Sequence, residues 1–133
     1  MKTIKKAFSI FLILLSINIL TSCKEDEIEE DIDDRDLFVG NWNVSDMVVK
    51  QNYIVQIKKD ANNSTKIWLI NFHSTDSAFA YIQEKNVSLP NQTIASGLSA
   101  RGNGTMSGTT KINWEYFVND GSDIDTIQAI YTK

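Results

Sequence analysis

From Leu37 to Lys133 the apolar residues recur at every second position in short runs, which is the spacing of residues on one face of a β-strand. The clearest run alternates Ile112, Trp114 and Tyr116 with polar neighbours. No stretch of useful length in this region has the period of about 3.6 residues that an amphipathic helix requires. The alternation therefore predicts an all-β domain over 37–133.

Strands are predicted wherever β-branched and aromatic residues alternate with polar ones or form a short apolar run. The segment 66–72 is apolar at almost every position, so we expect both of its faces to be covered. The segment 85–89 ends at Pro90, which has no N–H to donate and is expected to stop a strand or mark an edge. The other predicted strands cover residues 42–48, 53–57, 78–83, 111–118 and 124–132.

Turn-forming residues separate these runs, and many of them are Asn, Asp or Gly, which suit tight hairpins. About eight strands at a spacing of roughly 12 residues predict an antiparallel up-and-down meander, closed as a barrel or folded as a sandwich. A barrel would leave no strand edge exposed. Two interpretations of the glycine-rich segment 93–108 stay open, namely one strongly bent strand or two short strands joined by a loop.

The first residues carry three lysines and no acidic group, and an apolar run follows from Ala7 to Leu20. A basic head and an apolar middle are typical of a secretory signal peptide. The run of about 14 residues is shorter than the roughly 20 that a helix needs to cross a bilayer. We therefore expect residues 1–22 to be a leader that is removed.

The end of this leader, Leu20-Thr21-Ser22-Cys23, resembles a bacterial lipobox, in which an aliphatic residue and two small residues precede a lipidated cysteine. Cys23 is the single cysteine of the chain, so it has no partner for an internal disulfide. We expect Cys23 to carry acyl chains such as palmitate and to anchor a lipoprotein in membrane lipid. Several chains would hold firmly, since each buried methylene contributes about 0.8 kcal/mol.

Residues 23–36 form an acidic segment with nine carboxylates against Lys24 and Arg35. A lysine followed by acids behind a lipidated cysteine resembles the surface-export signal of Bacteroidota lipoproteins. We therefore expect a flexible spacer on the cell surface of the outer membrane, with a periplasm-facing position as the alternative. The domain over 37–133 balances eight acidic against eight basic residues, which argues against a nucleic-acid partner, whose footprint is a basic stripe.

Phe38 and the triplet Gly40-Asn41-Trp42 open the first predicted strand. Glycine permits a tight backbone entry, and tryptophan is large enough to close one end of a small barrel. The triplet resembles the Gly-X-Trp signature of lipocalins, and from the lipobox onward the chain resembles the small lipocalin-like lipoproteins of Bacteroidota. The resemblance implies a lipocalin-like barrel with Gly40 and Trp42 as its closing motif. Where lipocalins place a late arginine against this tryptophan, the last strand offers Lys133.

The candidate catalytic residues do not form a convincing set. His73 is the single histidine and lies near Ser74 and Asp76, but neighbours in sequence rarely make a catalytic triad, so a surface loop is the better interpretation. Glu84 and Glu115 would act as a glycosidase pair only in a cleft that holds them about 5–10 Å apart, and nothing in the sequence places them so. We expect the protein not to be an enzyme.

Three aspartates, Asp120, Asp123 and Asp125, straddle a Gly-Ser turn near the end of the chain. Their carboxylates are suitable oxygen ligands for Ca²⁺, but the full calcium-loop pattern is missing, so turn chemistry is the better interpretation. One cysteine and one histidine cannot supply the spacing of a zinc site. We therefore expect no metal and no cofactor.

These features together predict a non-enzymatic, membrane-anchored binding protein whose partner is a small apolar molecule, a glycan or another envelope protein. An eight-stranded barrel is just wide enough to be filled by side chains or to hold one small ligand. We expect Trp42, Trp114 and Tyr116 to point inward and to fill most of the interior. The alternative is a protein-interaction or structural envelope subunit with a filled barrel, for which Trp68 is the candidate exposed contact.

Overall fold

The computed structural model describes residues 32–48 and 50–133. The predicted leader 1–22, the lipidation site Cys23 and most of the acidic segment lie outside the described residues. The folded unit begins at Ile32 and runs to Lys133. Within its described residues, no helix is long and apolar enough to span a membrane.

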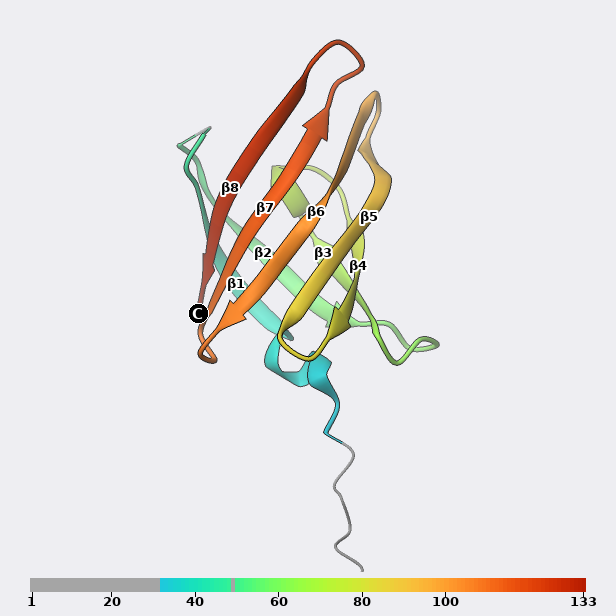
Figure 1. The fold of residues 1–133 in the computed structure, drawn as a ribbon, viewed down its shortest axis with the longest axis vertical. Helices are drawn as coiled ribbons and strands as arrows, with labels where there is room; N and C mark the ends of the chain where they lie inside the picture. Colours follow the sequence, from blue (N-terminus) through green and yellow to red (C-terminus); the bar gives the residue numbers. More distant parts are fainter. Residues whose placement is uncertain (1–31, 49) are drawn as a thin grey trace, which may run out of the picture. The chain divides into compact units, whose positions relative to one another are not determined.

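Eight antiparallel strands make up most of the described chain and close into one barrel in sequence order (Figure 1). Each strand pairs with the next, and β8 returns to pair with β1, so the sheet has no free edge. The predicted all-β, up-and-down barrel is confirmed. The strands are β1 (Gly40–Asp46), β2 (Asn52–Lys59), β3 (Lys66–Ile70), β4 (Ala78–Gln83), β5 (Asn86–Ala95), β6 (Leu98–Ser107), β7 (Lys111–Asn119) and β8 (Ile124–Thr132).

Side chains alternate between the barrel interior and the outer surface, as the period of two predicts. In β7 the inward positions, including Trp114 and Tyr116, are buried, and the positions between them are mostly exposed. The largest fully buried side chains of the core are Trp42, Tyr116, Tyr131, Phe38, Phe72, Ile57, Ile67, Leu69, Ile94, Ile112, Val44 and Val55.

Two strands end earlier than predicted. β1 stops at Asp46 because its Oδ1 accepts a hydrogen bond from Val48 N (2.8 Å), which turns the chain, and Val48 is exposed. β3 stops at Ile70, since Asn71 adopts a left-handed conformation. Its outward positions are not fully covered: Trp68 is half-buried and Ile70 is 36% exposed. The prediction of a strand buried on both faces is therefore wrong.

β5 runs through Pro90, where a strand end was predicted. A register shift between Leu89 and Gln92 accommodates the missing N–H donor. Backbone pairing between β4 and β5 covers only the stretch from Tyr81 to Gln83. At Phe79, which precedes this stretch in β4, the Gln92 side chain makes the hydrogen bonds that a paired strand would make. Its Oε1 accepts from Phe79 N (2.9 Å) and its Nε2 donates to Phe79 O (2.7 Å).

The glycine-rich segment 93–108 forms the end of β5, a tight turn at Gly97 and the whole of β6. β6 pairs with β7 without a register shift from Ser99 to Ser107, and Gly102 lies directly opposite Tyr116. A Cβ on Gly102 would come within 2.4 Å of Tyr116 Cα. Glycine is therefore required there because two backbones approach closely.

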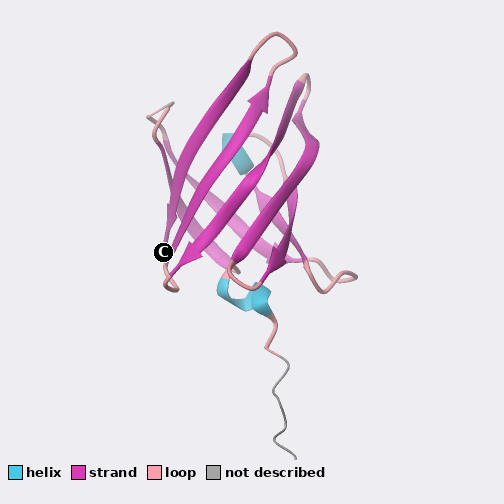
Figure 2. Cartoon of the chain, viewed as in Figure 1, coloured by secondary structure: helices cyan, strands magenta, loops and turns pink. Residues whose placement is uncertain are grey.

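A short 3-10 helix, η2 (Asp34–Leu37), precedes β1 and lies at one end of the barrel, while η3 (Phe72–Ser74) lies towards the other (Figure 2). Arg35 is buried, and its Nη1 donates to the carbonyl oxygens of Asp60 (3.1 Å) and Asn63 (2.7 Å) in the β2–β3 loop. Its Nη2 pairs with Asp33 (2.7 Å). The ordered domain thus starts before residue 37, since this part of the predicted spacer is fastened to the barrel.

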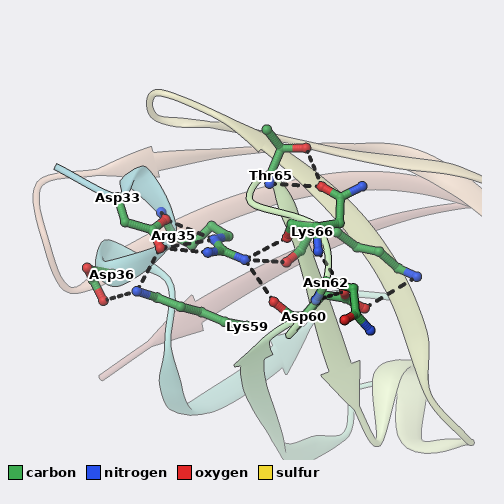
Figure 3. A network of polar contacts seen from close by, with 9 residues as sticks. Asp33, Arg35, Asp36, Lys59, Asp60, Asn62, Thr65 and Lys66 are labelled. Atoms are coloured by element: carbon green, nitrogen blue, oxygen red, sulfur yellow. Dashed lines mark hydrogen bonds and ion pairs between the residues drawn. The ribbon is translucent and has the colours of Figure 1, made fainter. Parts of the chain in front are cut away.

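Lysine and aspartate side chains complete the contacts of η2 with the barrel (Figure 3). Lys59 Nζ lies 2.8 Å from an Asp33 carboxylate oxygen and 2.6 Å from one of Asp36. The Arg35 guanidinium, and after it Lys59, holds the pKa of Asp33 well below its usual range. The carboxylate of Asp33 therefore stays charged at any pH at which the barrel is expected to work.

Trp42 lies at the same end of the barrel and is fully buried. Its Nε1 donates to Phe38 O (2.6 Å), so the indole fixes the chain that enters β1. Gly40 has a φ of 128°, a conformation that residues with a side chain rarely adopt. The two residues of the predicted closing motif thus hold the turn from η2 into the barrel.

The last residue covers the Trp42 ring. Lys133 Nζ lies 4.5 Å from the ring centroid and donates to the carbonyl oxygens of Leu37 (3.3 Å) and Val39 (2.8 Å). An ammonium over an indole face is attracted by the negative π-surface. Lys133 therefore sits where the resemblance to lipocalins implies an arginine, while Arg101 lies exposed on β6.

Candidate functional site in the barrel interior

The β3–β4 loop turns an aromatic side chain into the barrel. Phe72, which the sequence predicts as the end of a strand, begins η3 and is fully buried. Its ring centroid lies 4.9 Å from that of Tyr116 and 6.1 Å from that of Trp114. The loop around it is strained, because Asn71, His73 and Ser74 have φ values of 65°, 52° and 56°.

His73 lies in this loop but is half-buried, so the prediction of a surface histidine is corrected. Its Nδ1 is 3.0 Å from Tyr116 Oη, which makes a hydrogen bond between the loop and β7. Burial lowers the pKa of His73, and the charges of Asp46 and Asp125 oppose this only in part. The imidazole is therefore neutral around pH 7.

Three tyrosines, Tyr53, Tyr116 and Tyr131, come together inside the barrel from β2, β7 and β8. Burial raises the pKa of each, and the negative charge of Asp46 raises it further. All three phenols are consequently protonated and can act as donors and acceptors of hydrogen bonds.

Several polar atoms of this cluster have no hydrogen-bond partner among residues 32–48 and 50–133. They are the indole Nε1 of Trp114 and the hydroxyls of Tyr53 and Tyr131, two phenols that lie near enough to each other to act on one another's pKa without forming a well-aligned hydrogen bond. Trp114 and Tyr131 are 97% or more buried and lie with ring centroids 5.7 Å apart. Buried polar atoms are normally paired, so this group marks the interior as a candidate binding site.

The outer wall of the barrel is different in character. A groove of about 600 Å³ lies over β4, β5 and β6 and is lined mainly by polar side chains such as Ser88, Asn103 and Thr105. A second, of about 460 Å³, crosses β6, β7 and β8. Both are open to solvent and carry few charges.

Three aromatic residues form a row on the outside of β3 and β4, which we call the outer aromatic row: Trp68, Phe79 and Tyr81. Neighbouring ring centroids lie 6.0 Å and 5.8 Å apart. Lys66 Nζ lies 4.2 Å from the Trp68 ring, and Trp68 Nε1 donates to Asp60 Oδ2 (2.8 Å). The greater exposure predicted for Trp68 is thus explained by its place on the outer wall.

The structure does not bring the candidate catalytic residues together. Ser74 and Asp76 are exposed in the β3–β4 loop, whereas the His73 ring contacts Tyr116. Glu84 lies in the β4–β5 turn and Glu115 points outward from β7. Neither carboxylate belongs to the interior cluster.

Of the three aspartates near the end of the chain, Asp120 holds the β7–β8 turn, and Asp125 lies on β8. Asp120 Oδ1 accepts hydrogen bonds from Ser122 N (2.8 Å) and Asp123 N (2.9 Å), which is the turn chemistry that the sequence favours. Among the described residues, no group of three or more His, Cys, Asp or Glu side chains is placed to hold a metal ion.

Sequence reasoning did not identify the interior cluster as a site. Tyr53 and Tyr131 occupy ordinary inward strand positions, and only their hydroxyl groups distinguish them from other core residues. Phe72 could not be recognised as a site residue because it ends the apolar run 66–72, which is predicted as a strand. The available signal was the Asn71-Phe72-His73 sequence itself, because asparagine and histidine tolerate positive φ and polar residues then interrupt the alternation.

No protein-family model matches this chain, and no curated protein matches it. Solved structures do match. The barrel EF1p2_mFAP2b, solved bound to DFHBI, has a TM-score of 0.56 at 13% identity, and the match covers 76% of this chain and 97% of that one. A redesigned β-barrel, b11L5F_LGL, has a TM-score of 0.54 at 10% identity, covering 77% and 96%. The likeness shows the fold: this chain is a closed, antiparallel, up-and-down β-barrel.

Proposed function

We propose that this chain is a lipid-anchored, non-enzymatic binding protein whose barrel holds one small, largely apolar molecule. The observation that carries the proposal is a set of buried polar atoms without a well-formed hydrogen bond, namely those of Tyr53, Trp114 and Tyr131, in a core that is mostly apolar. Each unpaired buried polar group costs about 1–3 kcal/mol of stability. A bound molecule with matching polar atoms would recover this energy.

The proposal draws support from the fold. Barrels of this size are able to hold one small ligand, and the similar barrel EF1p2_mFAP2b was solved with DFHBI bound. The aromatic walls supplied by Trp114, Tyr116 and Tyr131 suit a flat apolar molecule, since rings pack edge-to-face and offset.

Binding inside the barrel is tested by nuclear magnetic resonance of the full-length protein in detergent, titrated with coumarin as the probe. We expect the Trp114 indole N–H signal to move downfield as it gains an acceptor. The indole signals of Trp42 and Trp68 serve as internal references, because both already donate to protein oxygens at 2.6 Å and 2.8 Å. Shifts confined to Trp68, or no shift at all, would contradict the proposal.

The lipid anchor is a separate part of the proposal and rests on the lipobox ending at Cys23. Cys23→Ser removes the only thiol available for acylation and is expected to move the protein from the membrane fraction to the soluble fraction. Protease treatment of intact cells then distinguishes a surface position from a periplasm-facing one. Unchanged fractionation of the Cys23→Ser variant would refute the anchor.

A second candidate function is a protein-interaction subunit of the envelope, and the outer aromatic row favours it. Tyr81 on β4 is 40% exposed, Ile70 on β3 is 36% exposed and Ile54 on β2 is 56% exposed. Aromatic residues on a protein surface are common anchors of protein contacts. If the coumarin titration fails, crosslinking of envelope proteins to position 81 becomes the decisive experiment.

A further inference from the structure

We infer that the β3–β4 loop is a displaceable plug, in which the Phe72 ring occupies the ligand's place inside the barrel and is exchanged for it on binding. The inference rests on the proposed function and adds to it a gate and a ligand class. The plug is the segment 71–76, which leaves β3, turns Phe72 inward and returns to the wall before β4.

Phe72 packs against Trp114 without offering an acceptor to its indole N–H. Its ring meets Trp114 at a centroid distance of 6.1 Å with an angle of 62° between the planes. A phenyl ring has no lone-pair acceptor, so the nearby indole N–H stays unpaired. A ligand in the same place that carries an acceptor would interact better with this site than Phe72 does.

The plug is held by a few polar contacts at its edges. Asn71 Nδ2 donates to Ile54 O (2.8 Å) on β2, and Thr75 Oγ1 lies 3.4 Å from Ile94 O on β5. The third contact is the hydrogen bond of His73 with Tyr116 (3.0 Å). The Asn71 contact is exposed and the other two are partly buried, and all three can break without unpairing a strand.

Backbone strain brings the closed plug nearer in energy to an open one. His73 and Ser74 both have positive φ, which is unfavourable for residues other than glycine. A ligand shifts the loop from closed to open only if it binds the open state more tightly than the closed one. Strain in the closed state reduces the difference in affinity that is needed. The strain therefore favours exchange.

The ligand class follows from the chemistry of the walls. Trp114 Nε1 only donates, so the ligand must bring a hydrogen-bond acceptor. The surrounding rings of Tyr116 and Tyr131 suit a flat aromatic body. The buried carboxylate of Asp46 acts on these phenols and opposes a negative charge beside them. The site thus fits a neutral, flat aromatic molecule with a carbonyl-type acceptor.

The test measures the affinity of the full-length protein for two probes of the same size, coumarin and naphthalene, of which only coumarin has acceptors. Phe72→Ala removes the plug and is expected to raise coumarin affinity at least tenfold, since the binding-competent state becomes the main one. Ser74→Gly relieves the strain of the closed state and is expected to lower coumarin affinity about fivefold, equivalent to about 1 kcal/mol. Partition of the probes into detergent is the same for every variant.

Matched controls separate the plug from general effects. Phe79→Ala removes a phenylalanine from the outer aromatic row and should leave coumarin affinity unchanged. Ser77→Gly adds a glycine next to β4 at a residue without positive φ and should also have no effect. Ser74→Gly stabilises the fold, so the test stands even if Phe72→Ala fails to fold.

The outcomes distinguish the plug from the proposed function. If coumarin binds in the interior with an affinity that neither Phe72→Ala nor Ser74→Gly changes, the plug is overturned and the proposed function stands. Equal affinities for coumarin and naphthalene in Phe72→Ala would overturn the acceptor requirement. Absence of interior binding in every variant would overturn both. Opposite effects of the two substitutions, with a downfield shift of the Trp114 signal, support the inference.

Discussion

Trp42 is the residue whose removal should harm the barrel most. Trp42→Ala deletes a fully buried indole and its 2.6 Å hydrogen bond to Phe38 O, and it leaves Lys133 without the ring beneath it. Replacing a buried tryptophan by alanine costs about 3–5 kcal/mol. The lost hydrogen bond adds about 0.5–1.5 kcal/mol. Against a total stability of about 5–15 kcal/mol, the variant should be partly or wholly unfolded at room temperature.

The assay is urea unfolding followed by circular dichroism, which does not depend on the indole that is removed. Trp42→Phe keeps a ring but loses the N–H donor and should cost about 1–3 kcal/mol. The matched control is Trp68→Ala on the outer wall, where we expect a loss of about 1 kcal/mol. A loss below about 1 kcal/mol for Trp42→Ala, or one equal to the Trp68→Ala control, would refute the role of Trp42 in closing the barrel.

Three further predictions concern other parts of the fold. Arg35→Ala should cost about 2–4 kcal/mol in urea unfolding because it leaves carbonyl oxygens of the β2–β3 loop unpaired, whereas the exposed control Arg101→Ala should cost under about 0.5 kcal/mol; equal losses would contradict the fastening of η2. The lowered pKa of His73 means that the unfolded chain binds its proton first as pH falls below about 6.5, so stability should decrease from about pH 8 to pH 5. The slope should stay well under about 1.4 kcal/mol per pH unit, since the ring is only half-buried, and it should flatten in His73→Gln; an unchanged slope would contradict the assignment. Gly102→Ala should destabilise or rearrange the β6–β7 pairing, because its Cβ would meet backbone at 2.4 Å, and near-normal stability with unchanged amide exchange in β6 would refute this close approach.

The strand framework could be predicted from the sequence because the period of two is a local signal. The inward positions of Trp114 and Tyr116 follow directly from alternation with polar neighbours. The course of β5 could not be predicted, since a side chain from Gln92 replaces the strand pairing that Pro90 disrupts. This replacement of backbone pairing by a side chain depends on Phe79, which lies 13 residues away from Gln92 in the chain.

The start of the domain and the candidate site depend on contacts that the local pattern does not contain. Arg35 lies in a strongly acidic segment, yet its partners in the β2–β3 loop are 25 and 28 residues further on. Phe72 continues an apolar run in sequence, but positive φ at Asn71 and His73 turns it into the barrel. The unpaired state of Trp114 Nε1 is visible only when all its neighbours are placed.

The most direct measurement of the central claim is native mass spectrometry of the full-length protein isolated from the cells that produce it, with detergent removed in the gas phase. The account predicts a single extra mass of a small neutral molecule in a ratio of one per chain. This mass should be lost in a variant that combines Trp114→Phe with Tyr131→Phe, while the Trp68→Phe control retains it. Two results together would contradict a ligand-binding barrel: a chain without any extra mass, and a Trp114 indole N–H signal that does not shift when coumarin is added.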